Sequence, residues 1–148
     1  MLSVMKLFVL LAGLAGLAAG AQLADVKTVY LFPMRNGFDQ ILATRLLEGR
    51  VFQLTTDPKA ADAVLTDRLG SAFEKTFDTH VLSLKDVEEG PRSTFSAGRG
   101  TLFLVSKSKQ ILWSTYQPPK DVSPKHLDRA ARKSVEQLKK DLLPPAAH

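Results

Sequence analysis

The sequence contains no cysteine. This absence excludes disulfide bonds, thiolate zinc sites and membrane attachment through a lipidated cysteine. The chain also lacks a Gly-x-Ser-x-Gly nucleophile elbow and a Gly-x4-Gly-Lys phosphate loop, which mark many hydrolases and nucleotide-binding enzymes. Its three histidines, His80, His126 and His148, include no pair four residues apart. The sequence therefore predicts no metal site and no cofactor.

The remaining composition is that of an ordinary globular protein. Of 148 residues, 45% are hydrophobic and 24% are charged, with a net charge of +5. Such a chain is neither disordered nor collagen-like, and its length favours a single domain.

The first 21 residues have the layout of a secretory signal peptide. Lys6 precedes an apolar stretch over residues 7–21, which ends in the small residues Ala19, Gly20 and Ala21. A signal peptidase accepts small residues at this position, so we expect cleavage after Ala21 and a periplasmic or secreted protein. A retained membrane anchor is the alternative, although a spanning helix needs about 20 apolar residues. The remaining residues, 22–148, carry 19 Lys and Arg against 15 Asp and Glu.

Hydrophobic periodicity and turn residues predict the elements of residues 22–148. We expect strands over residues 26–32, 51–55, 63–66, 101–105 and 111–116, with a weak strand over 81–84. We expect a helix over residues 37–48 closed by Gly49, a short helix over 71–77, and a long helix that follows Ser123. The polar segment 85–99 is expected to be a mobile loop, and residues 144–148 a short disordered tail.

The order of these elements predicts an α/β (α+β) fold for one domain over residues 22–148. The opening half reads as a βαβ unit and the closing half as a hairpin followed by a helix. We expect a small mixed sheet of about five to six strands, with the two main helices packed on one face.

One candidate site lies at the ends of two predicted strands. If the strands at Val26 and Ala63 are parallel neighbours, Arg35, Asp67 and Arg68 emerge at the same edge of the sheet. Ligands of open α/β sheets bind beyond the carboxyl ends of their strands, so these residues are candidates for holding an anionic or polar ligand. The alternative is that Asp67 forms a local ion pair and Arg35 is solvated.

A hydrolase is the alternative function, with Asp67 acting together with Glu74 or Asp78. Asp62 and Asp67 flank one short strand and are expected on its opposite faces, which makes them a poor acid–base pair. Without a nucleophile–base motif, the sequence assigns no catalytic residue and favours a protein that is not an enzyme.

Positive charge is concentrated in the second half of the chain. Residues 85–148 hold 12 Lys and Arg against 7 Asp and Glu, whereas residues 22–84 hold 7 against 8. The candidate partner-binding residues in this half are Arg99, Lys125, Arg129, Arg132 and Lys133. Such cations suit an acidic protein, a cell-wall polymer or an anionic membrane surface, and nucleic acid is not expected for an exported protein. Because Asp128, Glu136 and Asp141 share the last helix, a mixed, solvated face is the alternative.

Three stretches, PKAADAVLTDRLG, GTLFLV and QILWSTY, precede the closing amphipathic helix. In this series the chain resembles a broad group of small exported bacterial domains: uncharacterised lipoprotein-type domains, the amino-terminal domain of TolB and the penicillin-binding-protein activator lipoproteins. The resemblance implies a non-enzymatic α/β binding module of the cell envelope. The chain departs from the lipoproteins in having no lipidated cysteine, and Ser106 stands where such hairpins often carry Asp.

Together these observations predict an exported, non-enzymatic binding module for an envelope protein or cell-wall polymer. A small hydrolase around Asp67 and a structural secreted protein without a ligand site remain the alternatives. The oligomeric state is left open.

Overall fold

The computed structural model describes residues 22–82, 94–95 and 100–143. The expected signal peptide, the tail 144–148 and segments 83–93 and 96–99, which include Arg99, lie outside the described residues. The helices are α1 (Phe38–Gly49), α2 (Ser71–His80) and α3 (Pro124–Leu142), with short 3-10 turns at Leu23–Asp25, Arg35–Gly37 and Pro58–Ala60. The strands are β1 (Thr28–Leu31), β2 (Gln53–Leu54), β3 (Ala63–Thr66), β4 (Leu69–Gly70), β5 (Thr94–Phe95), β6 (Thr101–Ser106) and β7 (Ile111–Tyr116).

The main sheet has five strands in the order β2-β1-β3-β6-β7. β1 pairs in parallel with β2 and with β3, and β6 pairs antiparallel with β3 and with β7. The expected mixed sheet, with a βαβ opening half and a hairpin–helix closing half, is confirmed. A separate pair of strands, β4 and β5, is antiparallel.

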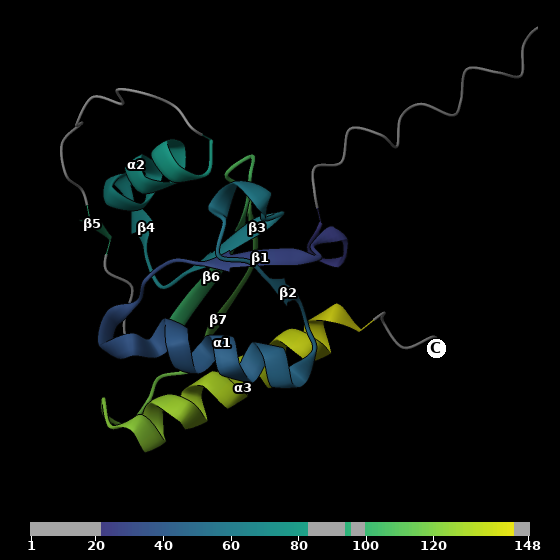
Figure 1. Ribbon diagram of the computed structural model, residues 1–148. Coiled ribbons are helices and arrows are strands. Elements are labelled where there is room, and N and C mark those ends of the chain that lie inside the picture. Colours follow the sequence, from purple (N-terminus) through teal and green to yellow (C-terminus); the bar gives the residue numbers. More distant parts are fainter. Residues whose placement is uncertain (1–21, 83–93, 96–99, 144–148) are drawn as a thin grey trace, which may run out of the picture.

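One face of the sheet is covered by α1 and α3, which lie side by side (Figure 1). Alternate residues of the strands point to this face because side chains alternate along a strand. They pack against apolar residues of both helices, such as Leu42 and Leu46 of α1 and Leu138 of α3. The sheet residues of this core include Val29, Ala63, Leu65, Leu102, Leu104 and Trp113. The two main helices thus share one face, as the sequence predicts.

The opposite face is covered by the third helix, α2 (Figure 1). Phe73 and Phe77, which the sequence places on the inner side of this helix, are buried against Phe32, Val64 and Val105. These residues come from β1, β3 and β6 or directly follow them. No described residue of β7 belongs to this cluster. Ile111 lies opposite Val105 and Tyr116 lies opposite Thr101, and a shift of register between Leu104 and Val105 puts both on this face of β7, where they are 53% and 62% exposed.

An ion pair ties α2 to the β6–β7 hairpin. Lys109 Nζ lies 2.7 Å from Asp78 Oδ1, whose side chain is 11% exposed. Because the carboxylate is largely buried, water screens this contact between opposite charges only weakly. Lys109 has a φ of 64°, a left-handed conformation that is unusual for a residue with a Cβ. The residue with this unusual backbone conformation is thus the one whose side chain pairs with Asp78.

The sequence predicts that Gly49 closes α1 in a left-handed conformation, and this prediction is wrong. The left-handed residue that closes the helix is Arg50, with a φ of 52°, and Gly49 is the last helical residue. A Cβ on Gly49 would lie 3.0 Å from Lys139 Cε and 3.2 Å from Val135 Cγ1. The glycine is therefore explained by the close approach of α3 rather than by its φ angle.

Two further expectations are corrected. Val81 and Leu82 follow α2 as its cap and a bend instead of beginning a strand, and residues 83–84 lie outside the described residues. Within the expected loop 85–99, Thr94 and Phe95 form β5 and pair with Leu69 and Gly70. The rest of that loop lies outside the described residues. Across the described part of the chain, no helix is long and apolar enough to span a membrane.

Candidate binding surface

The structure brings Arg35, Asp67 and Arg68 together. Since β1 and β3 are parallel neighbours, both strands end at the same edge of the sheet. The Arg35 backbone N–H donates to Asp67 Oδ2 over 3.4 Å, and Arg68 Nε donates to Asp67 Oδ1 over 3.1 Å. The Thr66 hydroxyl adds a hydrogen bond to the Arg68 carbonyl oxygen. Each carboxylate oxygen of Asp67 therefore accepts a local hydrogen bond. These contacts stabilise the turn after β3, and they favour a structural role for Asp67 over ligand binding.

Asp78, one of the two carboxylates considered as a partner for Asp67 in hydrolysis, does not lie beside it. Asp67 follows the last residue of β3, whereas Asp78 is paired with Lys109 in the β6–β7 turn. Ala63, the first residue of β3, lies opposite Ser106 next to that turn. Asp67 and Asp78 thus lie toward opposite ends of β3. Asp62 is also committed to structure, because it accepts the backbone N–H groups of Lys27 and Thr28, each over 3.0 Å.

The carboxylates of α3 face the protein more than the sequence indicates. Asp128 accepts Arg45 Nε and Nη2 of α1 over 2.6 and 2.8 Å. Asp141 accepts the Trp113 indole N–H of β7 over 2.7 Å. Glu136, the third carboxylate of α3, makes no such contact with another element among the described residues, and it is exposed. The Arg45–Asp128 pair lowers the pKa of Asp128, chiefly through the hydrogen bond from Arg45.

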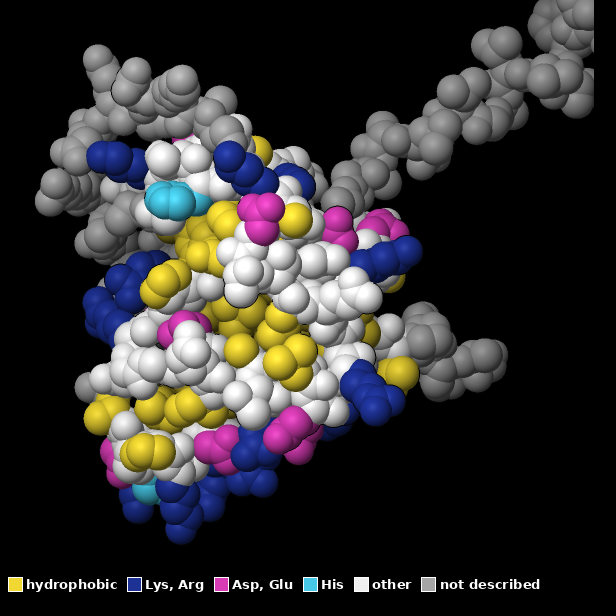
Figure 2. All heavy atoms as spheres, viewed as in Figure 1, with side chains coloured by type: hydrophobic (Ala, Val, Ile, Leu, Met, Phe, Trp, Pro, Cys, Tyr) yellow, Lys and Arg dark blue, Asp and Glu magenta, His cyan; other side chains and the backbone are white. Residues whose placement is uncertain are grey.

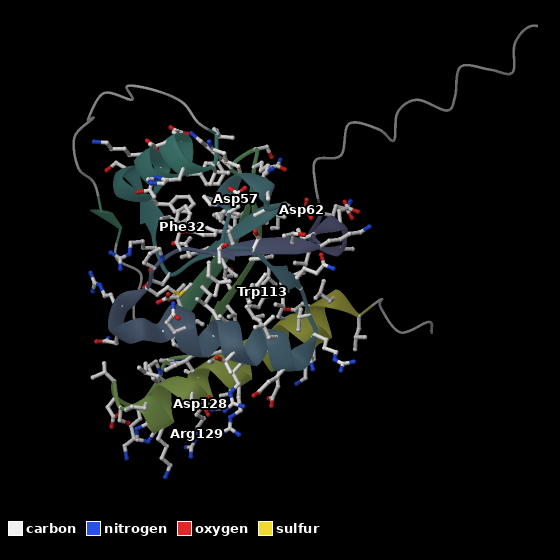
Figure 3. The ribbon with its side chains drawn as sticks, in the orientation of Figure 1. Phe32, Asp57, Asp62, Trp113, Asp128 and Arg129 are labelled. Atoms are coloured by element: carbon white, nitrogen blue, oxygen red, sulfur yellow. The ribbon has the colours of Figure 1, made fainter. Side chains whose placement is uncertain are left out.

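The outward side of α3 therefore carries mostly cations, with Glu136 as an exposed carboxylate among them. Lys125, Arg129, Lys133 and Lys140 are all exposed, and we call them the cationic row. Their spacing places them within a sector of about 80° on the helix surface. Figure 2 has Lys and Arg side chains gathered along its lower edge, where Figure 1 places α3, and Figure 3 has Arg129 directed away from the sheet. Arg132, also a predicted residue, lies 3.4 Å from Asp128 and is partly neutralised.

Lys140, which the sequence also places on the basic last helix, belongs to the same row as Lys125, Arg129 and Lys133 and lies two helical turns from Lys133. The hydrogen bonds of Asp128 and Asp141 have no signal in the sequence, because their partners Arg45 and Trp113 are distant along the chain.

The N-terminus of α3 holds an Asp, a Ser and a His that resemble a catalytic triad only in composition. Ser123 Oγ lies 3.0 Å and Asp121 Oδ1 lies 2.7 Å from the same atom, His126 Nδ1. A triad needs the two partners on different ring nitrogens, so that the base can relay a proton. Here the Ser123 N–H also donates to Asp121 Oδ1 over 2.9 Å. The cluster therefore fixes the start of the helix.

The same cluster predicts a pH dependence of stability. Hydrogen bonds from Ser123 and His126 lower the pKa of Asp121 to about 2. A carboxylate with a depressed pKa stabilises the folded state above its unfolded pKa of about 4, and this contribution is lost as the pH falls toward about 2. We expect urea unfolding at a series of pH values to give a shallower decline between about pH 4 and pH 2 for Asp121→Asn. Equal slopes for the two proteins would contradict this role for Asp121.

The cationic row of α3 is therefore the candidate binding surface. No group of three His, Asp or Glu side chains able to hold a metal occurs among the described residues. No family model, no curated protein and no solved structure matches the chain.

Proposed function

We propose that the protein is an exported, non-enzymatic binding module that holds an acidic partner of the cell envelope against the cationic row of α3. The observation that carries the proposal is that Asp128 bonds Arg45 and Asp141 bonds Trp113, so four exposed cations of α3 have Glu136 as the carboxylate left among them. Positive charge of this kind attracts an acidic partner over about a Debye length. Export rests on the layout of residues 1–21, and an envelope partner rests on the resemblance to exported bacterial domains.

The packing of α3 limits the kind of contact that it can make with a partner. A helix that inserts into a lipid surface needs a free apolar face. The apolar residues of α3, including Leu127, Ala131 and Leu138, are already buried in the core. Contact through α3 is therefore electrostatic, and an acidic protein surface suits it better than the interior of a membrane.

The proposal is tested with a capped poly-Glu peptide of about ten residues as the probe. We expect Lys133→Glu combined with Lys140→Glu to weaken binding about tenfold, because each exposed contact contributes modestly and reversal adds repulsion. Raising the ionic strength from about 0.01 M to about 1 M, which shortens the Debye length from about 30 Å to about 3 Å, should abolish binding.

The matched control carries the same change of charge outside α3. Lys27→Glu combined with Lys59→Glu alters two exposed lysines that lie before β1 and in the turn Pro58–Ala60. If both double variants weaken binding equally, only net charge matters and the cationic row is not the site. If no poly-Glu binding is measured at low ionic strength, the proposed function is wrong.

A further inference from the structure

The strand β7 is a free edge of the main sheet. Among the described residues it pairs with β6 alone, on one side. It is six residues long, about 20 Å, whereas the edge strand β2 at the other side has two residues. Edge strands are usually protected from further pairing by charges, proline or β-bulges; Ile111–Tyr116 contains no charge or proline, and its register with β6 shifts only next to Ile111, so Trp113–Tyr116 is a regular edge.

The hydrogen-bond pattern indicates which backbone groups of β7 point outward. The Gln117 N–H donates to the Gly100 carbonyl oxygen over 2.9 Å. Hydrogen-bonded pairs alternate along an antiparallel ladder, so Thr115 and Trp113 direct their N–H and C=O groups toward β6. Ser114 and Tyr116 then direct theirs away from the sheet. These groups are available to an added strand.

The two faces beside this edge differ in chemistry. On the α2 side, Ile111 and Tyr116 are exposed because α2 packs over β1, β3 and β6 only. On the other side lies α3, whose Asp141 contacts Trp113, whereas its Asp128 contacts α1. Lys133 and Lys140 are the i−4 and i+3 neighbours of Gln137, which bonds Asp141. They therefore lie on the flank of α3 beyond the β7 edge, away from α1.

We infer that β7 accepts an extended segment of the acidic partner as an added strand, and that this segment alternates acidic and apolar residues. Successive side chains of a strand point to opposite faces. The acidic side chains face Lys133 and Lys140, and the apolar side chains pack on Tyr116, at the regular end of β7. Main-chain hydrogen bonds to Ser114 and Tyr116 supply affinity, and the alternation supplies register and specificity. This inference rests on the proposed function and names the form of its partner.

A second copy of the chain is a less suitable occupant. Joining two β7 strands across a two-fold axis would bring the α3 flanks of both copies toward the same seam. Lys133 and Lys140 of one copy would then approach those of the other, and like charges disfavour this pairing. Charge complementarity therefore favours an acidic strand.

The probe for the test is a capped peptide of about six residues that alternates Glu and Val, the length matching β7. We expect it to bind at least about tenfold more tightly than a peptide of the same composition with its Glu and Val residues in two blocks. Methylation of every second backbone nitrogen, at those that would face β7, should abolish that advantage, because it removes the donors without changing the charge. The variant Ser114→Pro, which removes an outward N–H at an exposed edge position, should have the same effect.

The outcomes separate this inference from the proposed function. If the alternating, block and methylated peptides bind alike and all lose affinity in Lys133→Glu/Lys140→Glu, the acidic-partner function holds and strand addition is wrong. If none of them binds, both are wrong. Because Ser114→Pro is interpreted only if its circular dichroism and unfolding midpoint match those of the parent protein, the methylated peptide tests the inference independently. Concentration-dependent dimerisation blocked by Ser114→Pro in sedimentation would assign the edge to a second copy and overturn the inference.

Discussion

Replacement of Gly100 by alanine is expected to destabilise the protein by about 3 kcal/mol. Gly100 has a φ of +89°, where a Cβ adds about 1–2 kcal/mol of strain. The new Cβ would also lie 2.3 Å from the Gln117 carbonyl oxygen and 2.7 Å from Pro118 Cα. Backbone atoms cannot move aside as a flexible side chain can. The hydrogen bond from the Gln117 N–H to the Gly100 carbonyl oxygen, worth about 1 kcal/mol, would therefore be lost or strained.

A matched control separates conformational strain from collision. Gly37 also has a positive φ, of +69°, but a Cβ there meets no atom within 4 Å. We expect Gly37→Ala to lower the free energy of unfolding by about 1 kcal/mol, from strain alone. Urea unfolding of both variants measures the difference. Equal losses in the two variants would contradict the close approach of Gly100 to the Gln117–Pro118 backbone.

The variant Phe77→Ala is expected to lower the free energy of unfolding by about 3–5 kcal/mol. Phe77 is 0% exposed and its ring centroid lies 5.6 Å from that of Phe73, which in turn lies 5.1 Å from that of Phe32. Removing a buried phenylalanine ring loses its transfer free energy and leaves a cavity in a layer that only partly relaxes. The effect is large because α2 holds its face of the sheet through few large side chains.

The control for Phe77→Ala is Thr79→Ala, an exposed position on the same helix that should change stability by less than about 0.5 kcal/mol. Under conditions where Phe77→Ala remains folded, its affinity for poly-Glu should equal that of the parent protein, because α3 lies on the other face. A loss of stability below about 1 kcal/mol would show that α2 is not packed on the sheet through Phe77.

Sequence patterns predict most of the sheet and the two main helices. The residues of β1, β3, β6 and β7 are rich in β-branched, aromatic and aliphatic side chains, and turn residues bound them. The parallel pairing of β1 and β3 was only a condition of the argument for the Arg35–Asp67–Arg68 edge, and the structure contains it. The pairing of Thr94 and Phe95 was not predicted, because a two-residue strand in a polar segment has no periodicity of its own.

The sequence predicts the candidate surface only in part, because the contacts that bind its carboxylates are made across the tertiary structure. Helical spacing places the cations of α3 together, but it does not reveal where their neighbouring carboxylates are bound. Asp128 is held by Arg45 and Asp141 by Trp113, both contacts made across the tertiary structure. The free edge of β7 likewise depends on the strand order and on how far α2 extends over the sheet. Composition alone therefore describes a mixed surface, whereas packing ties Asp128 and Asp141 to other elements and leaves Glu136 exposed beside the cations.

The antiparallel pairing of β3 with β6 has a consequence for how the chain tolerates change in length. Thr66 lies opposite Phe103, so the chain leaves β3 and re-enters β6 at the same edge of the sheet. Residues 67–100, which include α2, are thus the connection between two paired antiparallel strands, and we call this connection the excursion. Loop-closure entropy grows slowly with length, by about 0.6 kcal/mol for each doubling. Insertions in this excursion leave the strand order and the α1–α3 layer intact, whereas deleting α2 would expose Phe32, Val64 and Val105 to water.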